Sequence, residues 1–499
     1  MRRPFALPVY AVMVLACAPS PNLVVSQPGT DDTTTGSVTE PVAADTIEVP
    51  GVPREFRGVW VATVYNLDHP SSTSLSADAQ KAELTDILDM AAELGLNAVL
   101  YQVRPTGGAL YDSALEPWSR WLTGVEGNDP GYDPLQFALT EAHARGLELH
   151  AWINPYRAGV SSSPAHGQGH MALRFPEHTH TYDGQQWMDP GAAVVREHVR
   201  AVVADLLDSY AVDGLHVDDY VYPYPDGSTE FPDTLTWSAY QNAGGTLSRD
   251  DWRRQNVHDL VEGLHQTVLT HRPSARLSIS PFGIYRPGQP EGVVGLDQFE
   301  ALFSDPLVWA DAGWVDDLGP QLYWPTTSSG QPFEALAQWW RDTLPDTIHV
   351  SPGLIPSNVG SSSAWTPQEL VTQITVLREV GAQGHIHFRA EALLTNQAGL
   401  RTALAPLYVE PTLTQPLVRG QQPGPPVVTA AGDEIRIEAK DRRALVLYEG
   451  SNDGTWELST ILPGTTTAWT PQDGVWALSQ VNAFGLESDG VLLPLPSGN

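Results

Sequence analysis

The sequence predicts a (β/α)8 TIM barrel followed by a second, smaller domain, an all-β sandwich. The barrel is predicted because short apolar segments alternate with amphipathic segments eight times between residues 56 and 407, which is the element order of a parallel barrel. The sandwich is predicted because short alternating segments follow residue 426, with turn residues at regular spacing between them. With 499 residues, of which 41% are hydrophobic, the chain is long enough for both cores.

Residues 1–17 predict a lipoprotein signal peptide. Arg2 and Arg3 precede an apolar run that is too short for a permanent span, and the run ends in Val-Leu-Ala-Cys, which resembles a lipobox with Cys17 as the lipidated residue. A plain secretory signal with an incidental cysteine is the alternative. We therefore expect a cell-envelope protein attached to a membrane by a lipid anchor at Cys17. Ala18 favours the outer membrane, facing the periplasm, in a Gram-negative host.

Residues 18–53 are rich in Pro, Thr, Ser and Asp without periodicity, and they predict a flexible tether. The barrel domain is expected over 54–410. Its strands are expected at 58–64, 98–103, 147–152, 214–217, 276–279, 318–321, 347–350 and 385–388. Its helices are expected at 77–94, 134–144, 192–211, 249–269, 299–309, 333–343, 367–380 and 396–407.

Spacing and capping signals support several helices. Val195, Val199, Val202 and Leu206 fall on one helical face. Thr-Pro-Gln-Glu at 366–369 is a capping box with proline in the first helical position. Asp133 and Ser248 are N-cap signals. The longest insertions follow the third and fourth strands, at about 155–191 and 220–248, on the face where a barrel carries its active site.

Residues 411–426 contain repeated prolines and predict a linker. The segments at 434–438, 444–448 and 474–478 alternate apolar and polar residues, as expected for strands of a sandwich over 427–499. The stretch at 481–488 resembles the final hairpin of a fibronectin type III module. The C-terminal domain is expected to be a spacer or an interaction module, because its sequence shows no site.

The charge of the chain limits its partners. Its formal net charge is −32 and only 17% of its residues are charged. Such a surface repels phosphate backbones, so nucleic acid is excluded as an expected partner. Cys17 is the only cysteine, so disulfides cannot stabilise the chain. No cofactor is expected, and the oligomeric state is left open.

The faces of the predicted strands place polar groups inside the barrel. In the fourth strand Leu215 and Val217 are expected to pack outward, which leaves His216, Asp218 and Tyr220 pointing inward. The same alternation in five other strands adds Gln102, Arg104, His150, Trp152, Asn154, Ser278, Ser280, Gln321, Tyr323, His387 and Arg389. Buried polar groups are costly unless they pair with one another or with a ligand. The ring therefore predicts a site at the barrel mouth, with a satisfied internal network as the alternative.

Six strand tips resemble, in order over 54–410, the bacterial glycosyl hydrolase-like family 10. They are Phe-Arg-Gly-Val-Trp-Val-Ala-Thr-Val-Tyr at 56–65, Gln-Val-Arg-Pro-Thr-Gly at 102–107, Trp-Ile-Asn-Pro-Tyr-Arg at 152–157, Gly-Leu-His-Val-Asp-Asp-Tyr-Val-Tyr-Pro at 214–223, Ser-Pro-Phe-Gly at 280–283 and Gln-Leu-Tyr-Trp at 321–324. The resemblance implies a TIM-barrel glycoside hydrolase. It also implies an envelope lipoprotein that acts on a polysaccharide, with the glycan strands of peptidoglycan as the expected substrate. The eighth strand, with His385, His387 and Glu391, departs from the family pattern, so the fine substrate specificity stays open.

Asp218 and Asp219 are the predicted catalytic carboxylates. The resemblance places them at the family's aspartate pair, and glycoside hydrolysis needs an acid together with a nucleophile or base. Neighbours on an extended strand point to opposite sides, so we expect Asp218 in the mouth. Asp219 is expected either to turn in from the strand-to-loop bend or to orient the loop. In the second case the other carboxylate is one of Asp68, Asp112, Asp189 and Glu391.

The predicted substrate-binding residues surround this pair. They are Arg104, His150, Asn154, Tyr156, Arg157, His216, Tyr220, Gln321, Tyr323, Trp324 and Glu391. The arginines are expected to hold a substrate carboxylate or to keep Asp218 ionised, the histidines to bond sugar hydroxyls, and the aromatic rings to stack on sugars.

Two other functions stay open. One is a metal-dependent hydrolase or deacetylase on the same barrel, with His150, His216, His385, His387 and Asp218 as ligand types, although their spacing matches no metal motif and no metal is expected. The other is a non-catalytic glycan-binding lipoprotein.

Overall fold

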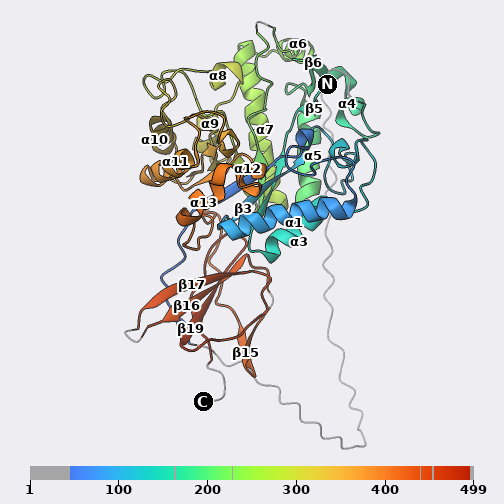
Figure 1. The fold of residues 1–499 in the computed structure, drawn as a ribbon. Coiled ribbons are helices and arrows are strands. Elements are labelled where there is room, and N and C mark those ends of the chain that lie inside the picture. Colours follow the sequence, from blue (N-terminus) through green and yellow to red (C-terminus); the bar gives the residue numbers. More distant parts are fainter. Residues whose placement is uncertain (1–44, 162–164, 228, 439, 452–453, 495–499) are drawn as a thin grey trace, which may run out of the picture. The chain divides into compact units, whose positions relative to one another are not determined.

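The structure, a computed structural model, describes residues 45–494 apart from 162–164, 228, 439 and 452–453 (Figure 1). The predicted signal peptide, Cys17 and most of the predicted tether lie outside the described residues. No helix among the described residues is long and apolar enough to cross a membrane.

A parallel sheet forms the barrel, in the order β11-β10-β9-β8-β4-β3-β2-β13-β12. Its strands are β2 Phe56–Val61, β3 Ala98–Arg104, β4 Glu148–Ile153, β8 Gly214–Val217, β9 Arg276–Ile279, β10 Asp317–Leu318, β11 His349–Val350, β12 Gly353–Leu354 and β13 Gly384–His387. β11 pairs with β10 and β12 pairs with β13. Because β11 and β12 are consecutive in the chain, together they form the seventh barrel strand and close the ring. The predicted barrel is confirmed.

The two faces of the strands pack differently. Outward residues such as Val59, Leu149 and Leu215 join one large core with the surrounding helices. A smaller cluster fills the interior and includes Phe56, Trp60, Leu100, Trp152 and Ile386. Gly58 and Gly214 belong to this crowded interior. A Cβ on Gly214 would lie 2.6 Å from Nδ1 of His150.

The helices around the sheet are α1 Ala77–Leu94, α3 Pro134–Ala144, α5 Ala193–Ser209, α7 Arg249–His271, α8 Gln298–Ala301, α9 Pro306–Asp311, α10 Phe333–Thr343, α11 Pro367–Glu379, α12 Ala390–Leu394 and α13 Leu400–Leu404 (Figure 1). The predicted helix at 299–309 is split in two, because Phe303, which lies between α8 and α9, has a positive φ. The predicted helix at 396–407 begins too early: Asn396 and Ala398 have positive φ, α13 starts at Leu400, and α12 precedes the predicted range. The predicted N-caps at Asp133, Ser248 and Thr366 are present. However, the Glu369 carboxylate binds Thr326 rather than the cap backbone.

The insertions carry their own structure. A small antiparallel sheet, β5 Arg157–Gly159, β6 Thr179–Tyr182 and β7 Gln185–Met188, follows β4. The short helices α2 Arg120–Thr123, α4 Met171–Arg174 and α6 Thr234–Asn242 lie in the long loops. None of these elements was predicted, because each is too short to show periodicity.

The C-terminal region is all-β and antiparallel. One sheet has the order β1-β20-β19-β16-β17 and the other β14-β15-β18. The strands are β1 Thr46–Ile47, β14 Val428–Ala431, β15 Glu434–Ile437, β16 Ala444–Gly450, β17 Trp456–Pro463, β18 Ala468–Trp469, β19 Val475–Val481 and β20 Gly490–Leu492. The all-β domain is confirmed, and its fibronectin type III identity stays a prediction.

The end of the predicted tether and the predicted linker are both structured. β1 pairs with β20, and Val52 is buried. Leu413 and Leu417 in the linker are buried as well. The expectation of flexibility is therefore wrong for residues 45–53, because these apolar side chains find partners that lie hundreds of residues away.

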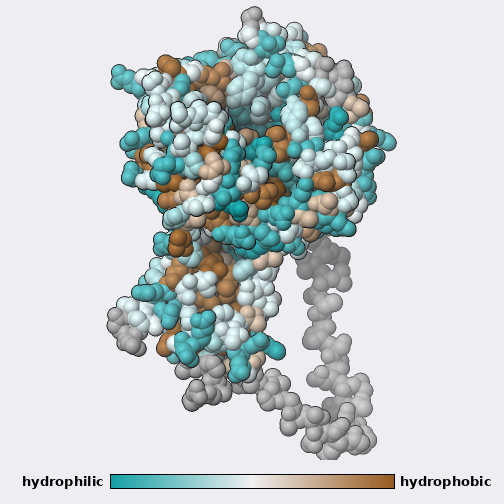
Figure 2. Space-filling view, viewed as in Figure 1, coloured by the Kyte–Doolittle hydropathy of each residue, from teal (hydrophilic) through white to brown (hydrophobic). Residues whose placement is uncertain are grey.

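Hydrophobic residues are interspersed with hydrophilic ones over the face of the molecule shown in Figure 2.

Candidate active site

A cavity of about 400 Å³ lies at the carboxyl ends of the barrel strands. It is lined by Trp60, Ala62, Val64, Tyr65, Leu67, Gln102, Trp152, Arg157, Asp218, Asp219, Tyr220, Tyr224, Ser280, Gln321, Tyr323, Ile355 and Phe388. Residues from β2, β3, β4 and the segments after β8, β9, β10 and β13 thus converge on one space. This is the end of a barrel at which enzymes of this fold carry their active sites.

Asp218 and Asp219 both enter this cavity because β8 ends before them. The strand runs Gly214–Val217, with Leu215 and Val217 in the outer core and His216 in the interior. Alternation between faces holds only inside a strand. Once the chain leaves the ladder at Asp218, consecutive side chains line the same space. Of the two arrangements expected for Asp219, the structure has the one in which it turns in from the bend.

The Asp218 carboxylate is held by three donors. Asn154 donates to Oδ2 at 2.5 Å, Trp152 donates to Oδ2 at 3.3 Å, and the backbone N–H of Tyr220 donates to Oδ1 at 3.2 Å. Burial raises the pKa of Asp218, while Arg157 and these donors oppose the rise. Charge and hydrogen bonding therefore favour the ionised form.

Asp219 lies in a different environment. The Tyr224 hydroxyl donates to Oδ2 of Asp219, and the Gln321 side chain also bonds the carboxyl group. Burial first, and the charge of Asp218 second, raise the pKa of Asp219 to about 7. Ionising two neighbouring carboxyl groups in a buried site costs free energy, because their negative charges repel each other. Asp219, with its pKa raised to about 7, is therefore the group that keeps the proton.

A relay of amides fixes the orientation of Asp218. Gln102 accepts hydrogen bonds from the backbone N–H groups of Thr63 and Val64, both at 2.9 Å. Its own amide then donates to Oδ1 of Asn154 at 2.7 Å. Asn154 must therefore turn its NH₂ group toward Asp218. Asn154 positions the carboxylate but is not among the residues that line the cavity.

Aromatic rings form much of the cavity wall, among them Trp60, Trp152, Tyr220, Tyr323 and Phe388. The Trp60 indole N–H donates to Nε2 of His216 at 3.0 Å. His216 lies beneath this wall, and burial lowers its pKa well below the ordinary value, so the ring is neutral. Its Nδ1 proton is then donated to Ser278 at 2.8 Å. His216 supports the wall and does not line the cavity.

Arg157 is the only cation among the described residues that line the cavity. Its guanidinium lies 5.0 Å from the centre of the Tyr220 ring, and its Nε donates to the Pro105 carbonyl at 3.2 Å. Tyr220, Gln321 and Tyr323, all predicted for this site, line it together with Arg157.

Arg104 does not reach the cavity. The register of β3 shifts between Gln102 and Arg104, which removes Arg104 from the face that carries Gln102. It forms a fully buried ion pair with Glu116 at 2.6 Å, and Glu116 also bonds His198 at 2.9 Å. Burial opposes ionisation of Glu116, but Arg104 and His198 hold its pKa at about 2. Arg104 donates to the carbonyl of Asn154 at 2.6 Å, so it is a positioning residue.

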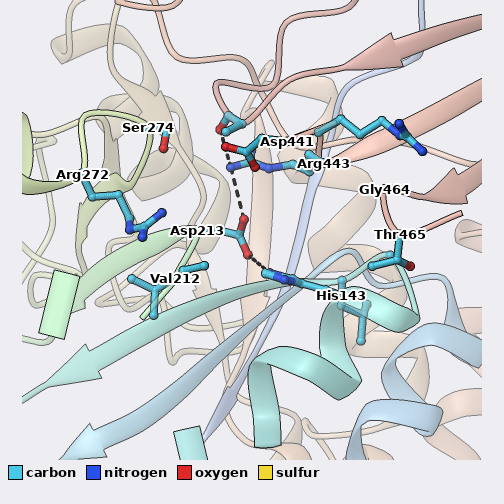
Figure 3. Close-up of a pocket in the computed structure, with 14 residues that line it drawn as sticks. His143, Val212, Asp213, Arg272, Ser274, Asp441, Arg443, Gly464 and Thr465 are labelled. Atoms are coloured by element: carbon cyan, nitrogen blue, oxygen red, sulfur yellow. Dashed lines mark hydrogen bonds and ion pairs between the residues drawn. The ribbon is translucent and has the colours of Figure 1, made fainter. Parts of the chain in front are cut away.

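His150 lies at the opposite end of the barrel. It bonds Glu148, the first residue of β4, at 3.0 Å, and Glu148 pairs with Arg443 at 2.6 Å. A cavity of about 150 Å³ adjoins this network (Figure 3). In it Asp213 contacts His143 at 2.8 Å and Arg443 at 3.5 Å (Figure 3). The acidic and basic side chains of this network pair with one another. We therefore assign the network a structural role.

Three other predicted binding residues also lie outside the cavity. Tyr156 is fully buried in the outer core, where its hydroxyl bonds none of the residues that the structure describes. Trp324 packs edge-on against Phe282, with ring centres 5.7 Å apart. Glu391 is exposed and pairs with Arg389 at 2.5 Å. Sequence alternation does not locate these residues because each follows the end of a strand.

The other proposed carboxylates lie outside the cavity. Asp68 accepts from the backbone N–H of Ala62 and pairs with Arg389, both at 2.8 Å. Asp189 accepts from Thr236 at 2.6 Å. Asp112 is exposed. None of them lines the cavity.

The proposed metal ligands are not brought together. His387 was expected on the inner face, but Ile386 occupies it. His385 and His387 both bond the Tyr408 hydroxyl, at 2.5 and 2.9 Å. A different group, Glu126, His166 and His170, places ligand atoms within 4.8 Å of one another.

His170 argues against a metal at that group. Its Nδ1 accepts the backbone N–H of Ala172 at 3.1 Å, so the ring proton is on Nε2, which lies 2.8 Å from the Thr106 carbonyl. A neutral imidazole offers a single lone pair, and here the backbone uses it. We assign no metal to this cluster.

The model of the glycosyl hydrolase-like 10 family matches residues 55–369, more than half of the chain. The chain is 35% identical over 397 residues to "Glycosyl hydrolase YngK" of Bacillus subtilis (strain 168), covering 76% of this chain and 78% of that protein. It is 32% identical over 397 residues to "Glycosyl hydrolase DigH" of Escherichia coli (strain K12), covering 74% of this chain and 86% of that protein. A solved structure, the PgaB (BpsB) glycoside hydrolase domain from Bordetella bronchiseptica, aligns with a TM-score of 0.47 at 13% identity, over 70% of this chain and 98% of that chain. The family match spans both aspartates of the cavity.

Proposed function

Because the chain belongs to the glycosyl hydrolase-like 10 family, we propose that it hydrolyses glycosidic bonds of a cell-envelope polysaccharide, the glycan strands of peptidoglycan. The observation that carries the proposal is the pair Asp218 and Asp219, two carboxyl groups in one cavity whose surroundings favour different protonation states. When the environments of two carboxyl groups move their pKa values apart, the group with the higher pKa can act as the acid and the other as the base or nucleophile.

The two aspartates take different roles in this proposal. Asp219 keeps a proton near neutral pH and donates it to the leaving oxygen. Asp218 is ionised and stabilises the positive charge that develops at the anomeric carbon. The amide relay through Gln102 and Asn154 holds this carboxylate in place before substrate arrives, so the transition state needs little reorganisation.

The remaining lining suits a sugar polymer. Aromatic side chains offer flat apolar faces for pyranose rings, and Gln321 and Tyr323 offer polar groups for hydroxyls. Arg157 provides a positive charge for a substrate carboxylate, such as the lactyl group of a strand without peptides. The expected anchor at Cys17 would keep the chain at the cell envelope, where this polymer is found.

The test is to incubate the full chain with peptidoglycan, with and without stem peptides, and to identify the released sugars by mass spectrometry. Asp218→Asn is expected to slow release by roughly 10- to 100-fold, because a charged hydrogen-bonding group contributes about 1.5–3 kcal/mol. Asp112→Asn, at an exposed aspartate outside the cavity, is the matched control and should leave release unchanged. Strand binding without sugar release by the wild type would support the non-catalytic alternative.

The pH dependence of kcat/KM provides a second prediction. The acid must be protonated to act, and the pKa of Asp219 is raised to about 7. Activity should therefore fall as the pH rises through about 7. Tyr224 donates to Asp219 and lowers its pKa, so Tyr224→Phe should move the fall in activity to higher pH. A profile that stays flat to pH 9 would rule out Asp219 as the acid.

A further inference from the structure

The cavity holds its carboxylates in an unusual arrangement. Among the described residues that line it, Asp218 and Asp219 are the only acids. They are consecutive, with Cα atoms about 3.8 Å apart, and both leave the end of β8. They therefore enter the cavity from the same strand end.

Hydrolysis by two protein carboxylates has a different requirement. The acid and the nucleophile or base flank the scissile bond, so that one of them, or a water that it activates, reaches the anomeric carbon from the face opposite the leaving group. The other lining residues include Tyr65, Leu67, Ile355 and Phe388, none of which carries a carboxyl group. Asp68, beyond the end of β2, has a fully buried side chain bound to Arg389. The described residues that line the cavity therefore supply no carboxylate on the opposite face of the sugar to act as the nucleophile.

The cavity can hold an amide close to the carboxylates. Oδ1 of Asp218 accepts one backbone hydrogen bond, so it has a lone pair left for an N–H donor. Tyr323 lines the cavity together with both aspartates. Burial first, and the charges of Asp219 and Asp218 after it, raise the pKa of Tyr323, so the phenol stays protonated and can donate to a carbonyl oxygen. Trp60, Trp152 and Phe388 provide apolar surface for a methyl group.

We propose that the sugar in the cavity carries a 2-acetamido group, and that the carbonyl oxygen of this group attacks the anomeric carbon in place of a protein nucleophile. This inference rests on the proposed glycosidase function and deepens it. It identifies the substrate as a 2-acetamido-2-deoxy sugar at the site of cleavage.

The first half of the reaction forms a cyclic intermediate. The acetamide oxygen forms a bond to C1 while the bond from C1 to the leaving oxygen breaks, and Asp219 gives its proton to that oxygen. Asp218 accepts a hydrogen bond from the amide N–H and takes that proton as the positive charge develops. The products of this half are a neutral oxazoline, an alcohol, ionised Asp219 and protonated Asp218.

The second half returns both protons. Ionised Asp219 takes a proton from water, the water oxygen forms a bond to C1, and the bond between C1 and the acetamide oxygen breaks. Asp218 returns its proton to the nitrogen. The sum is addition of water across the glycosidic bond, and because C1 inverts twice the product keeps its anomeric configuration.

The test uses one polymer in three forms. Peptide-free peptidoglycan strands are N-deacetylated, and portions are then re-N-acetylated or N-trifluoroacetylated. The re-acetylated strands are the matched control for the chemical treatment. The trifluoroacetyl group is close in size to acetyl, but its carbonyl oxygen is a much weaker nucleophile. Initial rates with the full chain give kcat and KM, and NMR gives the anomer formed first.

The inference predicts that the re-acetylated strands are cleaved like untreated ones with retention. The amine and trifluoroacetyl forms should lose at least about 10²-fold in kcat, because the intramolecular nucleophile is lost or weakened. Equal kcat on all three forms, or an inverted product, would overturn the inference while leaving the glycosidase function intact. No cleavage of untreated strands would overturn the proposed function, and this inference with it.

Discussion

Replacing Asp219 with asparagine is expected to lower kcat/KM on glycan strands by about 10²- to 10⁴-fold, the usual contribution of a general acid. Asparagine has nearly the same shape and can still accept the Tyr224 hydroxyl bond, but it has no proton to give to a leaving oxygen. The loss should appear in kcat more than in KM, because proton transfer takes place in the transition state.

Two controls make this prediction specific. Thermal unfolding of Asp219→Asn should show no loss of stability, since the substitution removes a buried ionisable group. The fall in wild-type activity above about pH 7 should be absent from the residual activity of the variant. A variant that keeps more than about a tenth of wild-type kcat/KM would contradict the assignment of Asp219 as the acid.

Exchanging Glu116 for glutamine is expected to lower the free energy of unfolding by about 3–5 kcal/mol, the usual cost of removing one partner of a buried ion pair. Arg104 and Glu116 are both fully buried, and Arg104 would be left without its counter-charge. The measurement is urea or thermal unfolding at pH 7. The pKa of Glu116 lies near 2, below its unfolded value. The wild type should therefore lose this contribution as the pH falls from about 4 through 2.

The matched control is Glu391→Gln, the same substitution at an exposed pair. Glu391 bonds Arg389 with a side chain that is 55% exposed, and exposed pairs contribute about 0–1 kcal/mol. Equal destabilisation by the two substitutions would show that the Arg104–Glu116 pair has no special structural role.

Much of the barrel could be predicted from local pattern. The strand at 214–217 was predicted with its observed limits, because Leu215 and Val217 alternate with His216 and the segment ends in two aspartates. The caps at Asp133, Ser248 and Thr366 could also be predicted, because each side chain bonds a backbone N–H only three residues later. The break in the predicted helix at 299–309 was missed, because it depends on the positive φ of Phe303, which hydrophobic periodicity does not report.

The site could be predicted only in part. Asp218, Asp219, Arg157, Tyr220, Gln321 and Tyr323 do line one cavity. Arg104 and His150 were placed there from alternation alone, which reports neither a register shift within a strand nor how far along the barrel an inward residue lies. The bulge after Gln102 redirects Arg104, and Glu148 holds His150 at the opposite end of the barrel. Their partners Glu116 and Arg443 lie far enough along the chain that no local pattern relates them.

The most direct test of the central claim is a crystal structure of the Asp219→Asn variant with a peptide-free glycan fragment bound. We expect a sugar ring between the aromatic walls of the cavity, with the scissile oxygen about 2.6–3.2 Å from the side chain at position 219. A fragment bound elsewhere on the chain, with this cavity empty of sugar, would contradict the account.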